Sequence, residues 1–123
     1  MGNNHRPKEC LVKRILNDDT LRQENAVHGG TGGCSQGNAG LGFRPAFFDY
    51  ATHAIHLSCF ANGRAAPFHL LDGLPDEAVA IRSNTGRVIA AKATLISGFE
   101  RNGFFYTRSA AARAARDWLP LAA

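Results

Sequence analysis

Short apolar runs of strand length, separated by turn residues, fill the chain from Leu41 onward. Asn62-Gly63 and Asn102-Gly103 are hairpin signals, because asparagine and glycine tolerate the positive φ angles of a type I′ turn. The runs predict strands over 43–49, 54–60, 65–71, 79–83, 87–99 and 104–106. This pattern predicts an α+β, mostly β fold: an antiparallel meander or small barrel of about five or six strands.

A helical period replaces the strand pattern near the C-terminus. Alanines and a tryptophan recur there so that they share one helix face: Ala111, Ala114, Ala115 and Trp118. Thr107 or Ser109 can cap this predicted C-terminal helix. Trp118 is expected to dock onto the sheet, and Pro120 is expected to end the helix.

A second amphipathic pattern lies near the N-terminus, where Pro7 fits the first position of a helix. The apolar side chains of this pattern are Leu11, Val12, Ile15 and Leu16. They fall within one arc of a helical wheel, which predicts a short helix over 7–17. The polar run from Asn17 to Thr20 then predicts a stop and the N-cap of a new helix.

A glycine-rich stretch separates these patterns, with seven glycines among the fourteen residues 29–42. Glycine loses the most backbone entropy on ordering, so this stretch is expected to be a flexible linker or long loop. The sequence is therefore divided into a helical N-terminal arm over 1–28, a linker over 29–42 and a compact β-rich domain with its C-terminal helix over 43–119.

Composition bounds the class of protein. The 123 residues are 45% hydrophobic and 20% charged, which is typical of a single globular domain. No apolar run approaches the roughly 18 residues of a membrane span, and the N-terminus carries no secretory signal. Cys10, Cys34 and Cys59 are too widely spaced for a disulfide framework, so reduced thiols in the cytoplasm are expected. The net charge of +4 permits nucleic acid as a partner without requiring it.

Histidine and cysteine residues raise the question of a zinc site at His53, His56 and Cys59. On a straight strand His56 would face away from the other two side chains, which would lie too far apart to share one ion. We therefore predict no metal site and no cofactor.

Cys34, followed by histidines, has the residue order of small cysteine hydrolases. A nucleophilic thiolate needs a helix N-terminus or a nearby imidazolium, and no helix is expected at Cys34. His69 and Asp72 could form an acid–base pair, although a histidine in an alternating strand is more often structural. A metal- or cysteine-dependent hydrolase is therefore an alternative that requires these groups to converge in one pocket.

Basic and aromatic residues are interspersed in the second half of the chain, as in small β-barrels that stack bases on aromatic rings. The candidate nucleic-acid-binding residues are Arg82, Arg87, Lys92, Arg101, Phe105 and Tyr106. This interpretation requires Phe105 or Tyr106 to be exposed on the same face as the basic groups. Nucleic-acid binding is thus the other alternative function.

Several runs in the second part of the chain have a recognisable form, among them Phe43 to Phe47, Ala66 to Pro75 and Phe105 to Arg108. Over about 43–115 the chain resembles uncharacterised proteins of proteobacterial accessory genomes, of the kind carried on integron cassettes and other mobile elements. The resemblance implies a bacterial cytoplasmic setting, and it implies no activity and no site residue.

The sequence is therefore interpreted as a small intracellular, non-enzymatic binding protein. Its partner is expected to be another protein or a second copy in a homodimer. An amphipathic helix on a tether and a free strand edge both favour association between protomers. No membrane partner is expected.

Overall fold

The computed structural model describes residues 15–122, and the side chains of residues 36 and 118–122 lie outside that description. The helices are α2 (Asp18–Val27), α3 (Ser35–Asn38) and α4 (Arg108–Ala122), with 3-10 turns at Ala39–Leu41 and Asp76–Ala78. The strands are β1 (Arg44–Asp49), β2 (Ala54–Leu57), β3 (Val79–Arg82), β4 (Val88–Ala91), β5 (Leu95–Arg101) and β6 (Phe104–Thr107).

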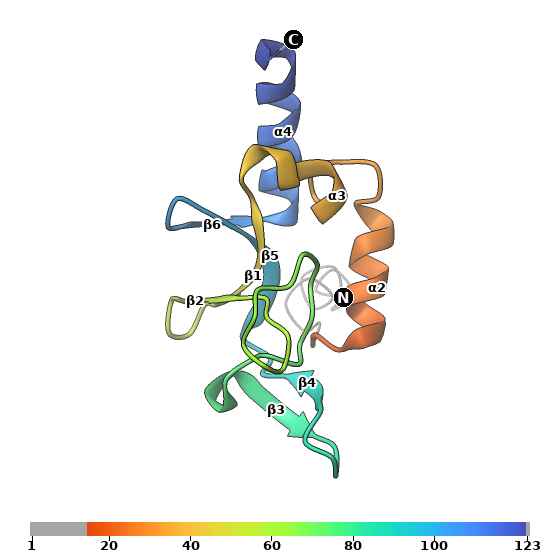
Figure 1. Cartoon of the computed structure of the whole chain (residues 1–123), viewed down its shortest axis with the longest axis vertical. Coiled ribbons are helices and arrows are strands. Elements are labelled where there is room, and N and C mark those ends of the chain that lie inside the picture. Colours follow the sequence, from red (N-terminus) through yellow and green to blue (C-terminus); the bar gives the residue numbers. More distant parts are fainter. Residues whose placement is uncertain (1–14, 123) are drawn as a thin grey trace, which may run out of the picture.

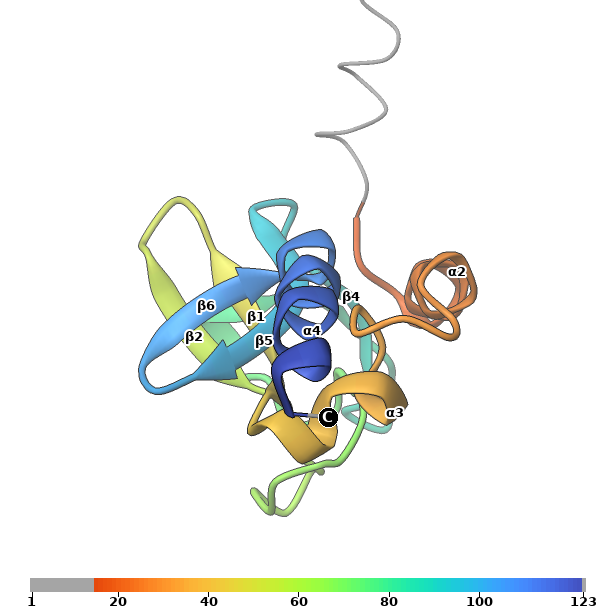
Figure 2. The same cartoon turned by 90° about the horizontal axis from the view of Figure 1, so that it is seen from above.

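Four strands form one antiparallel sheet in the order β2-β1-β5-β6, and β3 and β4 form a separate antiparallel pair. The predicted α+β, mostly β fold with a C-terminal helix is therefore confirmed, and the described strands close no barrel. Figure 1 shows α4 rising from the end of β6, and α2 on the side of the sheet away from the β1–β2 and β5–β6 turns. In the view from above (Figure 2), α4 lies over the sheet, and α2 lies to one side of both.

The β5–β6 hairpin shows how local sequence sets a strand pair. Asn102 and Gly103 have φ angles of 56° and 87°, the left-handed values that an Asn-Gly pair predicts. The turn brings Glu100 opposite Phe105. The strand predicted over 104–106 is thus confirmed as β6.

The strand predicted over 65–71 is wrong. This segment is irregular apart from one bridge between Cys59 and Ala65. The reason is that a side chain supplies a hydrogen bond that a neighbouring strand would otherwise supply. The Ser58 hydroxyl accepts the Leu70 N–H at 2.8 Å. The backbone groups of the segment therefore find partners without a ladder.

The strand predicted over 87–99 is two strands. A turn closed by a 3.0 Å hydrogen bond from the Leu95 N–H to the Lys92 carbonyl separates β4 from β5. The break lets β4 pair with β3 while β5 enters the larger sheet.

The C-terminal helix begins as predicted and ends later. The Thr107 hydroxyl accepts the Ala110 N–H at 3.0 Å, which confirms Thr107 as the capping residue. The predicted stop at Pro120 is wrong, because α4 continues to Ala122. The expected docking of Trp118 lies outside the described side chains.

The start of α2 confirms the predicted N-cap. The Asn17 side chain accepts the Thr20 N–H at 2.9 Å, and the Thr20 hydroxyl accepts the Asn17 N–H at 2.9 Å. Residues 15–17 are not helical, and the rest of the helix predicted over 7–17 lies outside the described residues.

The main hydrophobic core includes residues from α2 and from both sheets. It is formed by Leu16, Leu21, Phe47, Leu71, Leu74, Ala78, Val88, Ala91 and Leu95. Leu16 and Leu21 flank the α2 cap and are 2% and 5% exposed. The described part of the predicted arm is therefore built into the folded body, which corrects the expectation of a tethered helix.

The glycine-rich segment 29–42 is folded against α4. Cys34 and Asn38 are buried, and α3 contacts α4. A Cβ added at Gly32 would lie 2.3 Å from the Cβ of Ala115, so only glycine permits this close approach. The prediction of a flexible linker is wrong, because glycine serves packing here.

Candidate protein-interaction groove

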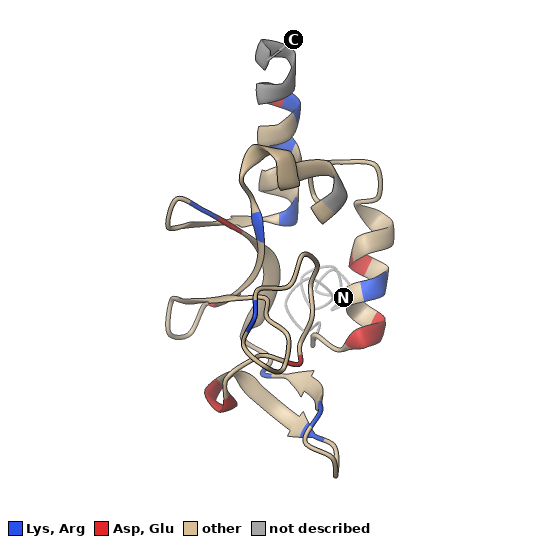
Figure 3. Cartoon of the chain, in the orientation of Figure 1, with Lys and Arg blue, Asp and Glu red and all other residues tan. Residues whose placement is uncertain are grey.

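The basic residues predicted to bind nucleic acid lie in two separate parts of the structure (Figure 3). Arg82, Arg87 and Lys92 belong to the β3–β4 region, whereas Arg101 ends β5 in the larger sheet. Arg101 is partly buried and donates from Nε to the Leu41 carbonyl at 2.9 Å. The fold therefore does not gather the four into one basic surface.

The two aromatic candidates on β6 are both half-buried. The Phe105 ring stacks on Phe48 with centroids 5.2 Å apart, and Tyr106 meets Phe43 edge to face at 4.9 Å. Both rings thus pack against other aromatic rings of the protein, and nucleic-acid binding stays a prediction.

The histidines and the cysteine considered for zinc are spread along the β1–β2 turn and β2. His53 lies in the turn with a φ of 65°, His56 is on β2 and Cys59 follows it. Within residues 15–122, no three His, Cys, Asp or Glu side chains are placed to hold a metal ion.

A buried polar cluster surrounds Arg108, the first residue of α4. Its guanidinium donates to Ser97 Oγ at 3.0 Å, to the Gly33 carbonyl at 3.1 Å and to His69 Nδ1 at 2.9 Å. Ser97 donates in turn to Glu24 of α2, whose carboxylate lies 3.5 Å from Arg108 Nε. Each guanidinium nitrogen has a partner, so this buried charge is both hydrogen-bonded and paired.

His69 is a neutral member of this cluster. Because a guanidinium can only donate, His69 Nδ1 accepts from Arg108, and the ring proton lies on Nε2, which donates to the Gly98 carbonyl at 2.6 Å. Burial, and after it the positive charge of Arg108, lower the pKa of His69 to about 3. Both ring nitrogens are thus engaged, and neither is placed to accept a proton from a nucleophile.

Cys34 reaches the same cluster from the glycine-rich segment. Its thiol interacts with Arg108, and its Sγ lies 3.7 Å from the Asn25 carbonyl. It lines a hollow of about 580 Å³ beside Phe68. Cys34 and His69 therefore converge on Arg108, yet His69 has no free ring nitrogen to act as a general base for the thiol, because Arg108 occupies Nδ1 and the Gly98 carbonyl occupies Nε2–H. Asp72, the expected partner of His69, instead lies 3.4 Å from Arg87.

A different hollow, of about 820 Å³, lies between the start of α2 and the β3–β4 hairpin. We call it the isoleucine groove. Its lining is formed by Ile15, Asn17, Asp18, Asp19, Arg22, Ile81, Ser83, Arg87, Val88, Ile89 and Ala90. Ile15, Ile81 and Ile89 are 43%, 55% and 48% exposed. One groove therefore holds three of the eight exposed large apolar side chains in the described part of the chain.

The floor of the isoleucine groove belongs to the core. Val88 is 3% exposed and packs in the main core cluster, while its neighbour Ile89 points outward on β4. A two-stranded hairpin is marginal by itself, so its attachment matters. The Ala91 N–H donates to the Leu16 carbonyl at 3.0 Å, which ties β4 to the segment leading into α2.

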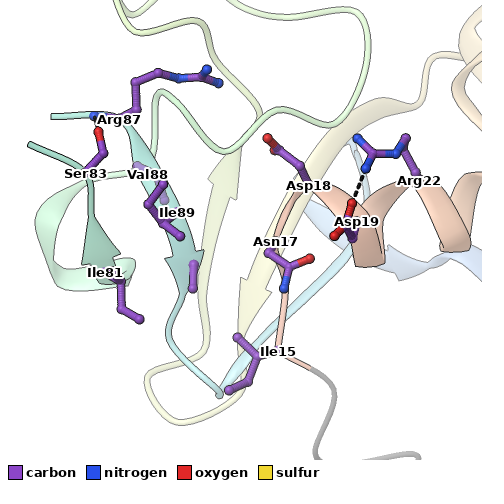
Figure 4. Close-up of a pocket in the computed structure, with 11 residues that line it drawn as sticks. Ile15, Asn17, Asp18, Asp19, Arg22, Ile81, Ser83, Arg87, Val88 and Ile89 are labelled. Carbon is purple, nitrogen blue, oxygen red and sulfur yellow. Dashed lines mark hydrogen bonds and ion pairs between the residues drawn. The ribbon is translucent and has the colours of Figure 1, made fainter. Parts of the chain in front are cut away.

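The two walls of the groove carry different charge. The α2 wall has Asp18, Asp19 and Arg22, with Arg22 bound to Asp19, whereas Arg87 is the charged lining residue of the hairpin wall. In Figure 4, Asp18 and Arg87 lie on opposite sides of the opening, Ile15 and Ile81 lie toward its other end, and Ile89 lies beside Val88 between Arg87 and Ile81. The groove thus has an acidic wall, a basic wall and an apolar centre.

Sequence reasoning named Arg87 for a different role and missed the isoleucines. The available signal was Val88-Ile89 in the strand predicted over 87–99, since two consecutive apolar residues on a strand point to opposite faces. One of the two side chains would therefore be exposed unless a second layer of structure covered that face of the strand. The contribution of Ile15 had no local signal, because it depends on how α2 meets the hairpin.

Comparison with protein-family models, with curated proteins and with solved structures found no match for this chain. None of the helices in the described part of the chain is long and apolar enough to cross a membrane. Function must therefore be inferred from the residues and their geometry.

Proposed function

We propose that this chain is a small non-enzymatic binding protein that contacts another polypeptide through the isoleucine groove. The carrying observation is the exposure of Ile15, Ile81 and Ile89 around one hollow with polar walls. Contiguous exposed apolar surface with a polar rim is typical of protein–protein contact sites, whereas single exposed apolar residues are common everywhere.

The other exposed apolar side chains support this choice by contrast. Phe60 and Phe68 already pack on each other edge to face, with ring centroids 6.0 Å apart. Val27, Tyr50 and Phe104 line none of the larger hollows described above. The isoleucine groove is therefore a surface at which a partner would remove several exposed apolar side chains from water together.

The proposed setting is the bacterial cytoplasm, on a mobile element, as the resemblance of the sequence implies. Within the described residues Cys34 and Cys59 form no disulfide, which agrees with the reducing compartment proposed here. A binding protein of this size would act by occupying a contact surface of another polypeptide chain.

Site-specific photocrosslinking tests the proposed function. We would place p-benzoylphenylalanine at position 89 of the full chain and irradiate the cells that produce it. The matched control carries the same residue at position 27, because Val27 is 77% exposed and lies outside the groove. We expect a discrete adduct from position 89 and none from position 27.

A second variant makes the test specific to the groove. Adding Ile81→Ser should remove the adduct from position 89, because the apolar contact surface is then interrupted. Equal adducts from both positions, or no adduct from position 89, would overturn the proposed function.

A further inference from the structure

We propose, resting on the binding function above, that the occupant of the isoleucine groove is a second copy of this chain. The two copies would be related by a two-fold axis that runs along the groove. An interface of this kind is isologous, so each wall of one copy faces the opposite wall of the other.

Charge supports this pairing. A two-fold axis along the groove brings the Asp18 carboxylate of each copy toward the Arg87 guanidinium of the other. Asp18 is exposed on the wall that carries the acidic excess. On the other wall Arg87 pairs with Asp72 of its own chain at 3.4 Å, and its side chain stays 60% exposed toward a second carboxylate. The same contact is made twice, and the walls that meet have opposite sign.

Apolar shape agrees with charge. Ile15 belongs to the α2 side of the groove, and Ile81 and Ile89 belong to the hairpin side. The same axis places Ile15 of one copy against Ile81 and Ile89 of the other, so all three exposed isoleucines are covered in both copies. A partner with one sign of charge would satisfy only one wall.

Charge reversal with exchange tests the pairing. We would compare the wild-type full chain with two single variants, Asp18→Arg and Arg87→Asp. The measurements are sedimentation equilibrium and native mass spectrometry. Each single reversal puts like charges in contact twice, so we expect the dimer Kd to rise by more than about tenfold. Mixing the two variants restores opposite charges at both contacts, and we expect a heterodimer to form.

Two further variants control the experiment. The double variant carrying Asp18→Arg and Arg87→Asp in one chain should dimerise again. Arg113→Asp, on the exposed surface of α4, should leave the dimer unchanged. Far-UV circular dichroism and unfolding midpoints establish that every variant compared is folded.

The outcomes separate this proposal from the proposed function. Failure of the mixture or the double variant to recover a dimer would overturn the second copy as occupant, and so would a monomeric wild-type chain. An adduct from position 89 with a different protein would also overturn it while leaving the binding function intact. A crosslink from position 89 to residues 1–14 of the same chain would overturn both, as would the absence of any adduct.

Discussion

The cluster around Arg108 and the isoleucine groove each reverse the usual placement of residues. The cluster buries an arginine at 4% exposure together with polar partners. The groove leaves three isoleucines 43–55% exposed. In the cluster, partners within the described chain satisfy the buried charge. In the groove, the described residues leave the isoleucines exposed.

This difference assigns the two regions to different tasks. A buried charge is costly unless its partners are in place, so the cluster must be complete in the folded chain alone. An exposed isoleucine carries no such penalty, and its burial stabilises a complex by about 25 cal/mol per Å² of apolar surface. Changes in the cluster should therefore reduce folding stability, and changes in the groove should reduce association.

The largest effect on stability is expected from Arg108→Met. The substitution keeps much of the side-chain volume but leaves Ser97, His69 and the Gly33 carbonyl without their donor. We expect the free energy of unfolding to fall by about 3–5 kcal/mol. Urea unfolding measures this loss, and Arg113→Met on the exposed side of α4 should change stability by less than about 0.5 kcal/mol. Equal effects at both positions would contradict a structural role for the cluster.

The next effect is a pH dependence carried by His69. Its pKa is about 3 in the folded chain, against about 6.5 in the unfolded chain. The unfolded state therefore binds more protons between these values, and stability is highest above pH 6.5 and falls as the pH drops toward 3. The contribution of His69 should fall by about 2 kcal/mol between pH 6.5 and pH 5.

A matched variant isolates this contribution. Gln at position 69 can donate and accept but does not titrate, so His69→Gln should flatten the decline between pH 6.5 and pH 5. Burial and Arg108 also lower the pKa of His28, which leaves a smaller decline of the same sign. An unchanged slope in His69→Gln would show that the imidazole is not held neutral as the geometry indicates.

A smaller effect separates packed glycines from free ones. A Cβ at Gly33 would lie 2.5 Å from His28 Nδ1 and 2.8 Å from the Arg108 carbonyl, whereas a Cβ at Gly40 meets nothing within 4 Å. We expect Gly33→Ala to destabilise the fold by roughly 1–2 kcal/mol through overpacking. Gly40→Ala should be neutral or stabilising by up to about 1 kcal/mol. Thermal unfolding of both variants distinguishes this packed segment from a linker, in which the two would behave alike.

Local signals predicted much of the fold. The Asn102-Gly103 turn, the Asn17 cap and the strand over 43–49 depend on residues close in sequence, and each is present in the structure. The prediction of a strand over 65–71 was wrong because the Ser58 side chain supplies hydrogen bonds that a neighbouring strand would have supplied. The prediction of a flexible linker over 29–42 was wrong because glycine content alone does not distinguish a flexible segment from a closely packed one.

The functional candidates depended more on distant residues. Arg108 meets His69 and Gly33 from 39 and 75 residues away in sequence, and an arginine opening a helix would ordinarily be exposed. Its burial could not be predicted without the tertiary fold. Ile89 carried a partial signal in its strand, while Ile15 joins the groove only because the segment before α2 pairs with β4.

The smallest effect on stability is expected in the groove itself. Ile81→Ser and Ile89→Ser together remove apolar side chains that are about half exposed already, so we expect the free energy of unfolding of the monomer to change by less than about 1 kcal/mol. Urea unfolding at a protein concentration well below the dimer Kd measures this monomer value. The same double variant should lose the concentration dependence of its unfolding midpoint, because that dependence comes from association. A loss comparable to that of Arg108→Met would mean that these isoleucines serve the fold, and the contrast between the two regions would disappear.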